Sequence, residues 1–183
     1  MNIAKKTVLI TGANRGIGRA LVNEALRRGA KRVYAGTRSA LQNTDNRVTP
    51  LTLDVTSVSQ IQRAVDEVDT LDVLINNAGV AIYDDLSNLD VIEQHLAVNF
   101  LGLLKVTHAF LPLLRRSKGA IVNNLSLAAQ QRGRNHGSWN SGIGCTEHGQ
   151  SRSGKTRPLA LREIKRCGIA RQKELLFLTY IPI

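Results

Sequence analysis

Three glycines near the start of the chain have a spacing that could hold the phosphates of a nucleotide. The segment Thr11–Gly18 reads TGANRGIG, and its glycines are Gly12, Gly16 and Gly18. It lies between an expected strand and an expected helix, which is the context in which such a turn binds a dinucleotide. The first glycine permits the tight turn, the second lets the backbone approach a pyrophosphate, and the third lets the helix pack closely on the sheet. The alternative is an ordinary strand-to-helix turn.

Two arginines indicate which dinucleotide this turn would prefer. In such a fold the residue about 20 positions after the last glycine meets the adenosine ribose, as an acid for a free 2′-hydroxyl or a base for a 2′-phosphate. This chain has Arg38 there, and Arg15 lies on the turn itself. Because a guanidinium can make two parallel hydrogen bonds to a phosphate, the pair favours NADP over NAD. The alternative is that both arginines are solvated surface residues.

The elements that must position these residues alternate between short aliphatic runs and helical segments. This alternation is typical of strand–helix–strand units around a parallel sheet. Right-handed crossovers then predict a doubly wound α/β Rossmann fold with strand order 3-2-1-4-5, truncated or altered at its C-terminal end. The expected strands are 7–11, 32–37, 48–55, 73–76 and 120–125, and the expected helices are 16–28, 58–68 and 90–116, the last bent or ended near Pro112.

With these motifs in this order, residues 5–128 resemble the short-chain dehydrogenase/reductase family. Beside the glycine-rich turn, the chain has Leu-Asp-Val at 53–55, Asn-Asn-Ala-Gly at 76–79, Asn99 in the long helix, and Ile-Val-Asn at 121–123 leading to Ser126. The resemblance implies a cofactor site built from the turn, the base after the second strand and two later segments. Its residues are Gly12, Asn14, Arg15, Gly16, Ile17, Gly18, Arg38, Asp54, Val55, Asn77, Ala78 and Gly79.

The same resemblance implies individual roles. Asp54 and Val55 would flank the adenine, and Asn77–Gly79 would support the central sheet and the cofactor. Ser126 would hydrogen-bond the substrate carbonyl, and Asn99 would hold a water in a proton relay. Taken singly, Asp54 would more often be a helix cap, Asn99 a satisfied helix residue and Ser126 a turn residue.

The C-terminal third departs from the family pattern. The family uses a tyrosine with a lysine four residues later as its proton-transfer pair, about a dozen residues beyond the serine. The corresponding window, 136–143, reads HGSWNSGI and has neither residue. The indole N–H of Trp139 only donates, so it cannot exchange a substrate proton. Patterning is lost after about Ala128 or Ala129, which suggests the hypothesis of an altered reading frame; a Tyr and a Lys in another frame of the locus would support it, and their absence would contradict it.

Charge also divides the chain into two parts. Residues 1–129 carry 15 basic and 11 acidic side chains, a net charge of +4, whereas residues 130–183 carry 10 and 3, a net charge of +7. We therefore expect a dinucleotide-binding domain over 1–128 and a basic, partly disordered tail over 129–183. An apolar run, Leu175–Ile181, could add a late strand.

Two motifs in the tail match binding sites only formally. The segment 149–156 has P-loop spacing, but no apolar strand precedes it. A zinc site could be imagined from four residues, but their spacing fits no standard pattern, so no metal is expected: His136, Cys145, His148 and Cys167.

These observations favour an NADP(H)-dependent oxidoreductase that transfers a hydride between the nicotinamide and an alcohol or carbonyl substrate. Two alternatives stay open: a catalytically inert dinucleotide-binding module, because the proton donor is missing, and a basic interaction protein. Two cysteines and no apolar run long enough to span a bilayer favour a cytoplasmic location without a membrane partner. Nucleic-acid binding is disfavoured because Trp139 is the only aromatic residue that lies between the arginines of the tail, where bases would need aromatic side chains to stack on. A homo-oligomer is compatible with this reading.

Overall fold

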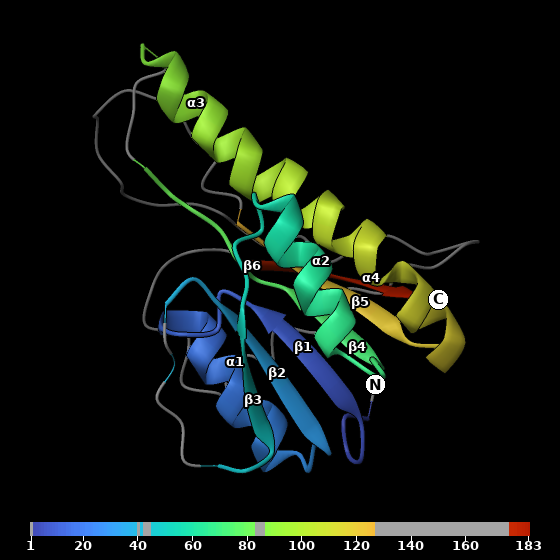
Figure 1. Ribbon diagram of the computed structural model, residues 1–183. Coiled ribbons are helices and arrows are strands. Elements are labelled where there is room, and N and C mark those ends of the chain that lie inside the picture. Colours follow the sequence, from blue (N-terminus) through green and yellow to red (C-terminus); the bar gives the residue numbers. More distant parts are fainter. Residues whose placement is uncertain (1, 40, 42–44, 83–86, 127–175) are drawn as a thin grey trace, which may run out of the picture.

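A six-stranded sheet forms the centre of the structure, a computed structural model that describes residues 2–39, 41, 45–82, 87–126 and 176–183. The strands lie in the order β3-β2-β1-β4-β5-β6 (Figure 1). The first five are parallel, which confirms the predicted order 3-2-1-4-5 and the Rossmann-type fold. The strands are β1 (Thr7–Thr11), β2 (Arg32–Thr37), β3 (Val48–Thr52), β4 (Val73–Asn76), β5 (Ala120–Ser126) and β6 (Leu176–Pro182).

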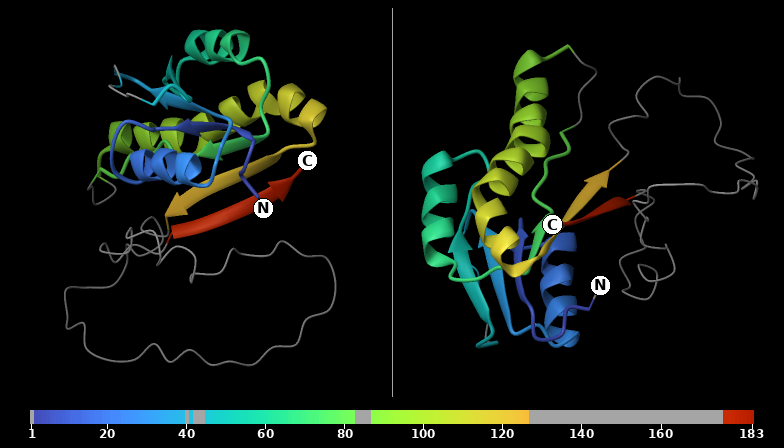
Figure 2. Two further views of the ribbon diagram at one scale, coloured as in Figure 1. Left: turned by 90° about the horizontal axis from the view of Figure 1, so that it is seen from below. Right: turned by 90° about the vertical axis from the view of Figure 1, so that its right-hand side faces the viewer.

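Helices cover both faces of this sheet. α1 (Gly16–Arg27) lies on one face, whereas α2 (Val58–Glu67) and the long helical segment after β4 lie on the other (Figure 2). Because successive strand residues point to opposite faces, Leu9 of β1 joins the core under α2, while Val8 and Ile10 join the core under α1. Both faces of the central strands are therefore apolar, as expected for a parallel sheet.

The ends of the two shorter helices follow the sequence signals. α2 begins after Ser57, whose hydroxyl oxygen accepts the backbone N–H of Gln60 at 3.4 Å. α1 ends at Arg27, and Gly29 follows with φ of +78°, a left-handed conformation that favours glycine. These local signals place α1 and α2 within one residue of the predicted ends.

The segment after β4 is a continuous run of helix with an irregular turn inside it. α3 (Leu89–His95) leads into a π-helical turn, η1 (Leu96–Gly102), and then into α4 (Leu103–Ser117). The helix does not end near Pro112, which lies inside α4. The irregular turn comes earlier and includes Gly102, where a Cβ atom would lie 2.6 Å from Cγ2 of Val55. Only glycine lets the helix approach the loop after β3 this closely.

This helical segment bears on the expectation that the chain has no membrane span, which stays a prediction. Among the described residues, Leu89–Ser117 is the single helix whose length and composition would allow it to cross a membrane. A core helix of a globular protein can have the same length and composition. Val106, Phe110 and Leu114 of this helix are fully buried and belong to the core on the α2 side of the sheet. These three residues pack the helix on the sheet.

A strand from the end of the chain occupies the edge of the sheet beside β5. β6 runs antiparallel to β5, with Leu176 opposite Ser126 and Pro182 opposite Ala120. This confirms the predicted late strand and adds its orientation. The P-loop-like segment 149–156 and the four His and Cys residues considered for zinc lie outside the described residues, and the division into two domains stays a prediction.

Candidate cofactor-binding site

The glycine-rich turn joins the end of β1 to the start of α1. Gly12 and Gly16 have φ values of +66° and +52°, which glycine adopts without strain. A Cβ atom on Gly16 would meet nothing within 4 Å, so the turn is open on this side. A Cβ atom on Gly18 would overlap the carbonyl oxygen of Gly12, so a glycine is required where the helix starts.

The first turn of α1 is not capped by a side chain. Arg15 is the N-cap residue and makes no side-chain capping hydrogen bond, and the first turn holds no acidic residue. The free N–H groups at a helix N-terminus, together with the helix dipole, attract an anion. With open space beside Gly16, the turn fits a pyrophosphate group. The predicted residue Ile17 lies within this first turn of α1.

The segment after β4 holds the glycine-rich turn in place. The hydroxyl oxygen of Thr11 accepts the backbone N–H groups of Asn77 and Ala78, both at 2.9 Å. The side-chain amide of Asn77 donates to the carbonyl oxygens of Thr11 at 3.0 Å and Gly12 at 3.3 Å. On β5, Nδ2 of Asn124 donates to Oδ1 of Asn77 at 2.9 Å. Asn77 therefore holds the turn, while its predicted contact with the cofactor stays a prediction. The contacts of Thr11 and Asn124 with this segment were not predicted from the sequence.

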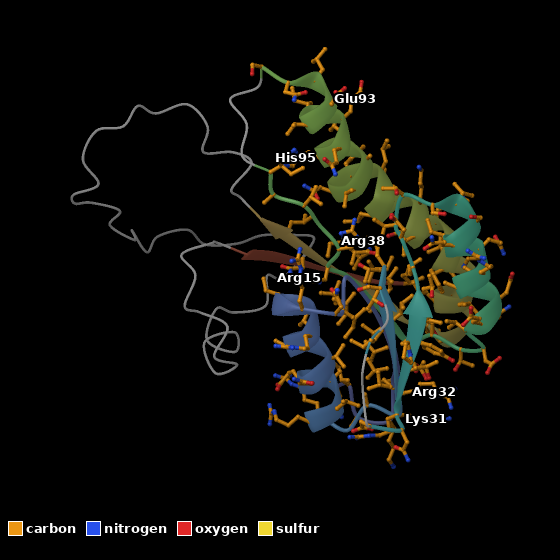
Figure 3. All side chains as sticks on the ribbon, turned by 60° about the vertical axis from the view of Figure 1, so that its left-hand side comes forward. Arg15, Lys31, Arg32, Arg38, Glu93 and His95 are labelled. Atoms are coloured by element: carbon orange, nitrogen blue, oxygen red, sulfur yellow. The ribbon has the colours of Figure 1, made fainter. Side chains whose placement is uncertain are left out.

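The two predicted arginines lie at the same edge of the sheet. Arg38 follows the end of β2 and Arg15 precedes α1, and both are exposed (Figure 3). Nδ2 of Asn14 donates to the hydroxyl of Ser39 at 3.3 Å, and the hydroxyl of Thr37 donates to the carbonyl oxygen of Ser39 at 2.5 Å. The first bond joins the loop after β2 to the glycine-rich turn, and the second holds Ser39 against the end of β2. Sequence reasoning missed Ser39, which directly follows the predicted arginine.

Asp54 is an ionised group near Arg38. Burial raises the pKa of its carboxyl, but hydrogen bonds from the backbone N–H and hydroxyl of Thr56, at 2.8 and 2.7 Å, and the nearby Arg38 guanidinium outweigh burial and lower this pKa below its ordinary value. Val55 is buried, and its side chain packs against Gly102. Their contact with an adenine ring stays a prediction.

The two predicted catalytic positions are Asn99 in η1 and Ser126 at the end of β5. Oδ1 of Asn99 accepts the backbone N–H of Val80 at 2.8 Å, and its Nδ2 donates to the Val80 carbonyl oxygen at 2.9 Å. A Cβ atom on Gly79 would lie 3.3 Å from the same Oδ1. Ser126 is the last residue of β5, which pairs with β4. Because β4 and β5 are parallel, Ser126 lies at the same sheet edge as the segment after β4.

The part of the chain that the structure describes shows no exposed tyrosine side chain that could replace the missing proton donor. Tyr34 is only 3% exposed and belongs to the core, so it cannot reach a substrate. Tyr83 and the side chain of Tyr180 lie outside the described part of the chain. Within that part, no group of three His, Cys, Asp or Glu side chains could hold a metal ion.

Known proteins match most of this chain. The family model of short chain dehydrogenases matches residues 6–141. Retinol dehydrogenase 12 of Bos taurus is 37% identical in an alignment 145 residues long, which covers 70% of this chain and 45% of that protein. Estradiol 17-beta-dehydrogenase 2 of Rattus norvegicus is 37% identical in an alignment 144 residues long, which covers 69% of this chain and 38% of that protein. The chain thus spans less than half the length of these two relatives.

A solved structure shares the fold. A short chain dehydrogenase from Burkholderia cenocepacia, in complex with NADP, gives a TM-score of 0.68 at 37% identity and covers 72% of this chain and 57% of that one. The family model covers more than half of the chain, including the glycine-rich turn and the segment that holds it. This chain therefore belongs to the short-chain dehydrogenase/reductase family.

Proposed function

We propose that this chain binds NADP(H) at the glycine-rich turn, on an oxidoreductase scaffold for alcohol and carbonyl substrates. The observation that carries the proposal is the open, uncapped start of α1 with Arg15 and Arg38 at the same edge of the sheet (Figure 3). Two guanidinium groups supply the charge that a 2′-phosphate requires and that NAD would not use. The NADP complex of the Burkholderia cenocepacia protein supports the same choice.

The residues that would hold this cofactor come from three loops at one edge of the sheet. The backbone N–H groups at the start of α1 would bind the pyrophosphate, Arg15 and Arg38 would bind the 2′-phosphate, and Asn77–Gly79 would line the path toward the nicotinamide. The bound nicotinamide supplies the hydride donor or acceptor for exchange between an alcohol and a carbonyl. Ser126 is proposed to hydrogen-bond the substrate carbonyl.

Asn99 is the second catalytic position proposed from the resemblance. Both polar atoms of its side chain bond to the backbone of Val80. Its side chain therefore shapes the loop after β4, and its place in a proton relay stays a proposal.

A second candidate function is a dinucleotide-binding module without catalysis. The observation that favours it is the missing proton-transfer pair: the window 136–143 has neither a tyrosine nor a lysine, and Tyr34 is buried. General acid–base catalysis contributes about 10²- to 10⁴-fold to such a reaction, so turnover without it should be very slow. Because residues 130–183 carry a net charge of +7, a basic interaction protein is a third candidate function.

A cofactor titration with a turnover assay separates these candidates. We expect the fluorescence of NADPH to change on binding to the full chain, with no measurable oxidation of NADPH on a panel of apolar aldehydes and ketones. The panel follows from the two relatives, which are named for retinol and estradiol. Turnover would support the enzyme, binding alone would support the inert module, and failure to bind NADPH would contradict both.

We also propose that two copies of the chain pair through the long helical segment. Large apolar side chains are exposed on it, and exposed apolar patches commonly mark protein contacts. Acidic Asp90 and Glu93 lie on one side of this patch, and basic Lys105 and His108 on the other, all exposed. Antiparallel pairing about a two-fold axis would place the acidic end of one copy against the basic end of the other. The apolar residues and their exposed fractions are Leu96 (53%), Phe100 (57%), Leu101 (44%) and Leu104 (47%).

Phe100→Glu is expected to raise the dimer dissociation constant at least about tenfold, because it places a charge at the centre of the apolar patch. Sedimentation velocity over a range of concentrations measures this change. Val58→Glu is the matched control, since Val58 is 67% exposed but lies at the start of α2, outside the patch. A wild-type chain that stays monomeric at all concentrations, or equal effects of the two substitutions, would contradict the pairing.

A further inference from the structure

Two side chains one helical turn apart hold the loop that continues from Asn77–Gly79. Asn99 binds both backbone groups of Val80, as described above. Four residues earlier on the same helix, Nε2 of His95 accepts the backbone N–H of Ile82 at 3.0 Å. Val80 and Ile82 are alternate residues, and the N–H groups of both bond to side chains of the same helical segment. The helix therefore offers two successive acceptors to the loop.

The hydrogen bonds of His95 determine which ring nitrogen carries its proton. Because Nε2 accepts an N–H, the neutral ring must have its proton on Nδ1. Nδ1 lies 2.8 Å from the carbonyl oxygen of Val91, one turn earlier in α3, and therefore donates to it. This second bond fixes the orientation of the ring of His95, which is labelled in Figure 3 and is the last residue of α3. His95 thus acts as a bridge from α3 to Ile82.

We propose that His95 is a positioning residue for the nicotinamide end of the cofactor site, a role that rests on the function proposed above. The loop begins at Gly79, which packs against Asn99, and it continues from β4, the strand next to Ser126. Asn99 fixes the loop only at Val80. His95 fixes it two residues farther on, so the two side chains together set the direction of the chain beside the expected nicotinamide position.

Three substitutions in the full chain distinguish the two bonds of His95. In His95→Gln the side-chain oxygen replaces Nε2 as the acceptor for Ile82, whereas in His95→Asn the shorter amide replaces only the donor to Val91. His95→Leu removes both. We expect hydrogen exchange at the Ile82 amide to be at least about tenfold faster in the Leu and Asn variants and close to wild type in the Gln variant.

Titration of the same variants with NADPH measures the consequence at the cofactor site. We expect the dissociation constant to rise about 2- to 10-fold in the Leu and Asn variants and to be restored in the Gln variant, while global stability in urea serves as the control for folding. Equal affinity in the Leu variant and the wild type would overturn the proposal, as would a Gln variant that behaves like the Leu variant. If the wild-type chain binds no NADPH, the proposed function fails and so does this role. If the wild type binds NADPH but its Ile82 amide exchanges as fast as in the Leu variant, the role of His95 is refuted and the proposed function is not.

Discussion

Arg38→Asp is expected to raise the dissociation constant for NADP⁺ about 100-fold and to leave that for NAD⁺ unchanged or lower. A hydrogen bond to a charged group contributes about 1.5–3 kcal/mol, which is roughly 10- to 150-fold in affinity, and the new carboxylate would also repel the 2′-phosphate. NAD⁺ has a 2′-hydroxyl at this place, to which an acid can bind. Isothermal titration with each cofactor measures both constants.

Two further variants sharpen this measurement. Arg63→Asp makes the same charge change on the exposed surface of α2, in the middle of the helix, and should alter neither constant by more than about twofold. Arg38→Lys keeps the charge but loses the planar pair of donors, so we expect an intermediate loss of NADP⁺ affinity. An unchanged preference in Arg38→Asp would contradict the assignment of Arg38 to the 2′-phosphate.

The same substitution has a second readout at Asp54. The Arg38 guanidinium is one of the groups that lower the pKa of the Asp54 carboxyl. Its replacement by a carboxylate removes this attraction, so the Asp54 pKa should rise. A carboxyl whose pKa is lowered on folding stabilises the folded state at pH values above its unfolded pKa, and this stabilisation is lost as the pH falls through the folded pKa. Because the variant has a higher Asp54 pKa in the folded state, we expect its acid unfolding to start at a higher pH.

The parallel part of the fold could be predicted because its signals are local. A few consecutive residues are enough to recognise the apolar runs of β1, β2, β4 and β5 and the glycine-rich turn. Right-handed crossovers then restrict the order of the parallel strands to very few arrangements, and the observed order is the predicted one. The third strand ends earlier than predicted, at Thr52, because the residues after it form the turn closed by Asp54 and Thr56.

Other features depend on contacts between residues far apart in the chain, so no periodic pattern of apolar residues in the sequence predicts them. The antiparallel direction of β6 follows from its pairing with β5, about 50 residues earlier in the chain. The π-helical turn is accompanied by the close approach of Gly102 to Val55 and by the bonds of Asn99 to Val80. The Asn124 side chain gains its role only through Asn77, which follows a different strand, β4.

Gly18→Ala is expected to lower the free energy of unfolding by about 3 kcal/mol or more. The added methyl group would overlap the carbonyl oxygen of Gly12 and lie 2.8 Å from Nδ2 of Asn77. The first of these neighbours is backbone, so α1 would have to move away from β1, and overpacking of this kind is among the more costly substitutions in a core. Urea unfolding followed by circular dichroism measures the loss.

Gly16→Ala separates the packing role of the turn from its binding role. Gly16 has φ of +52°, so alanine there is strained by about 1–2 kcal/mol, but its methyl group would enter open space. We therefore expect a folded variant that binds NADPH at least tenfold more weakly, because the methyl group occupies the place where the pyrophosphate would approach the backbone. A Gly16→Ala chain with wild-type affinity would mean that the phosphates do not approach the turn from this side. Equal stability of the Gly16 and Gly18 variants would mean that close packing of α1 on β1 does not depend on the glycine at the helix start.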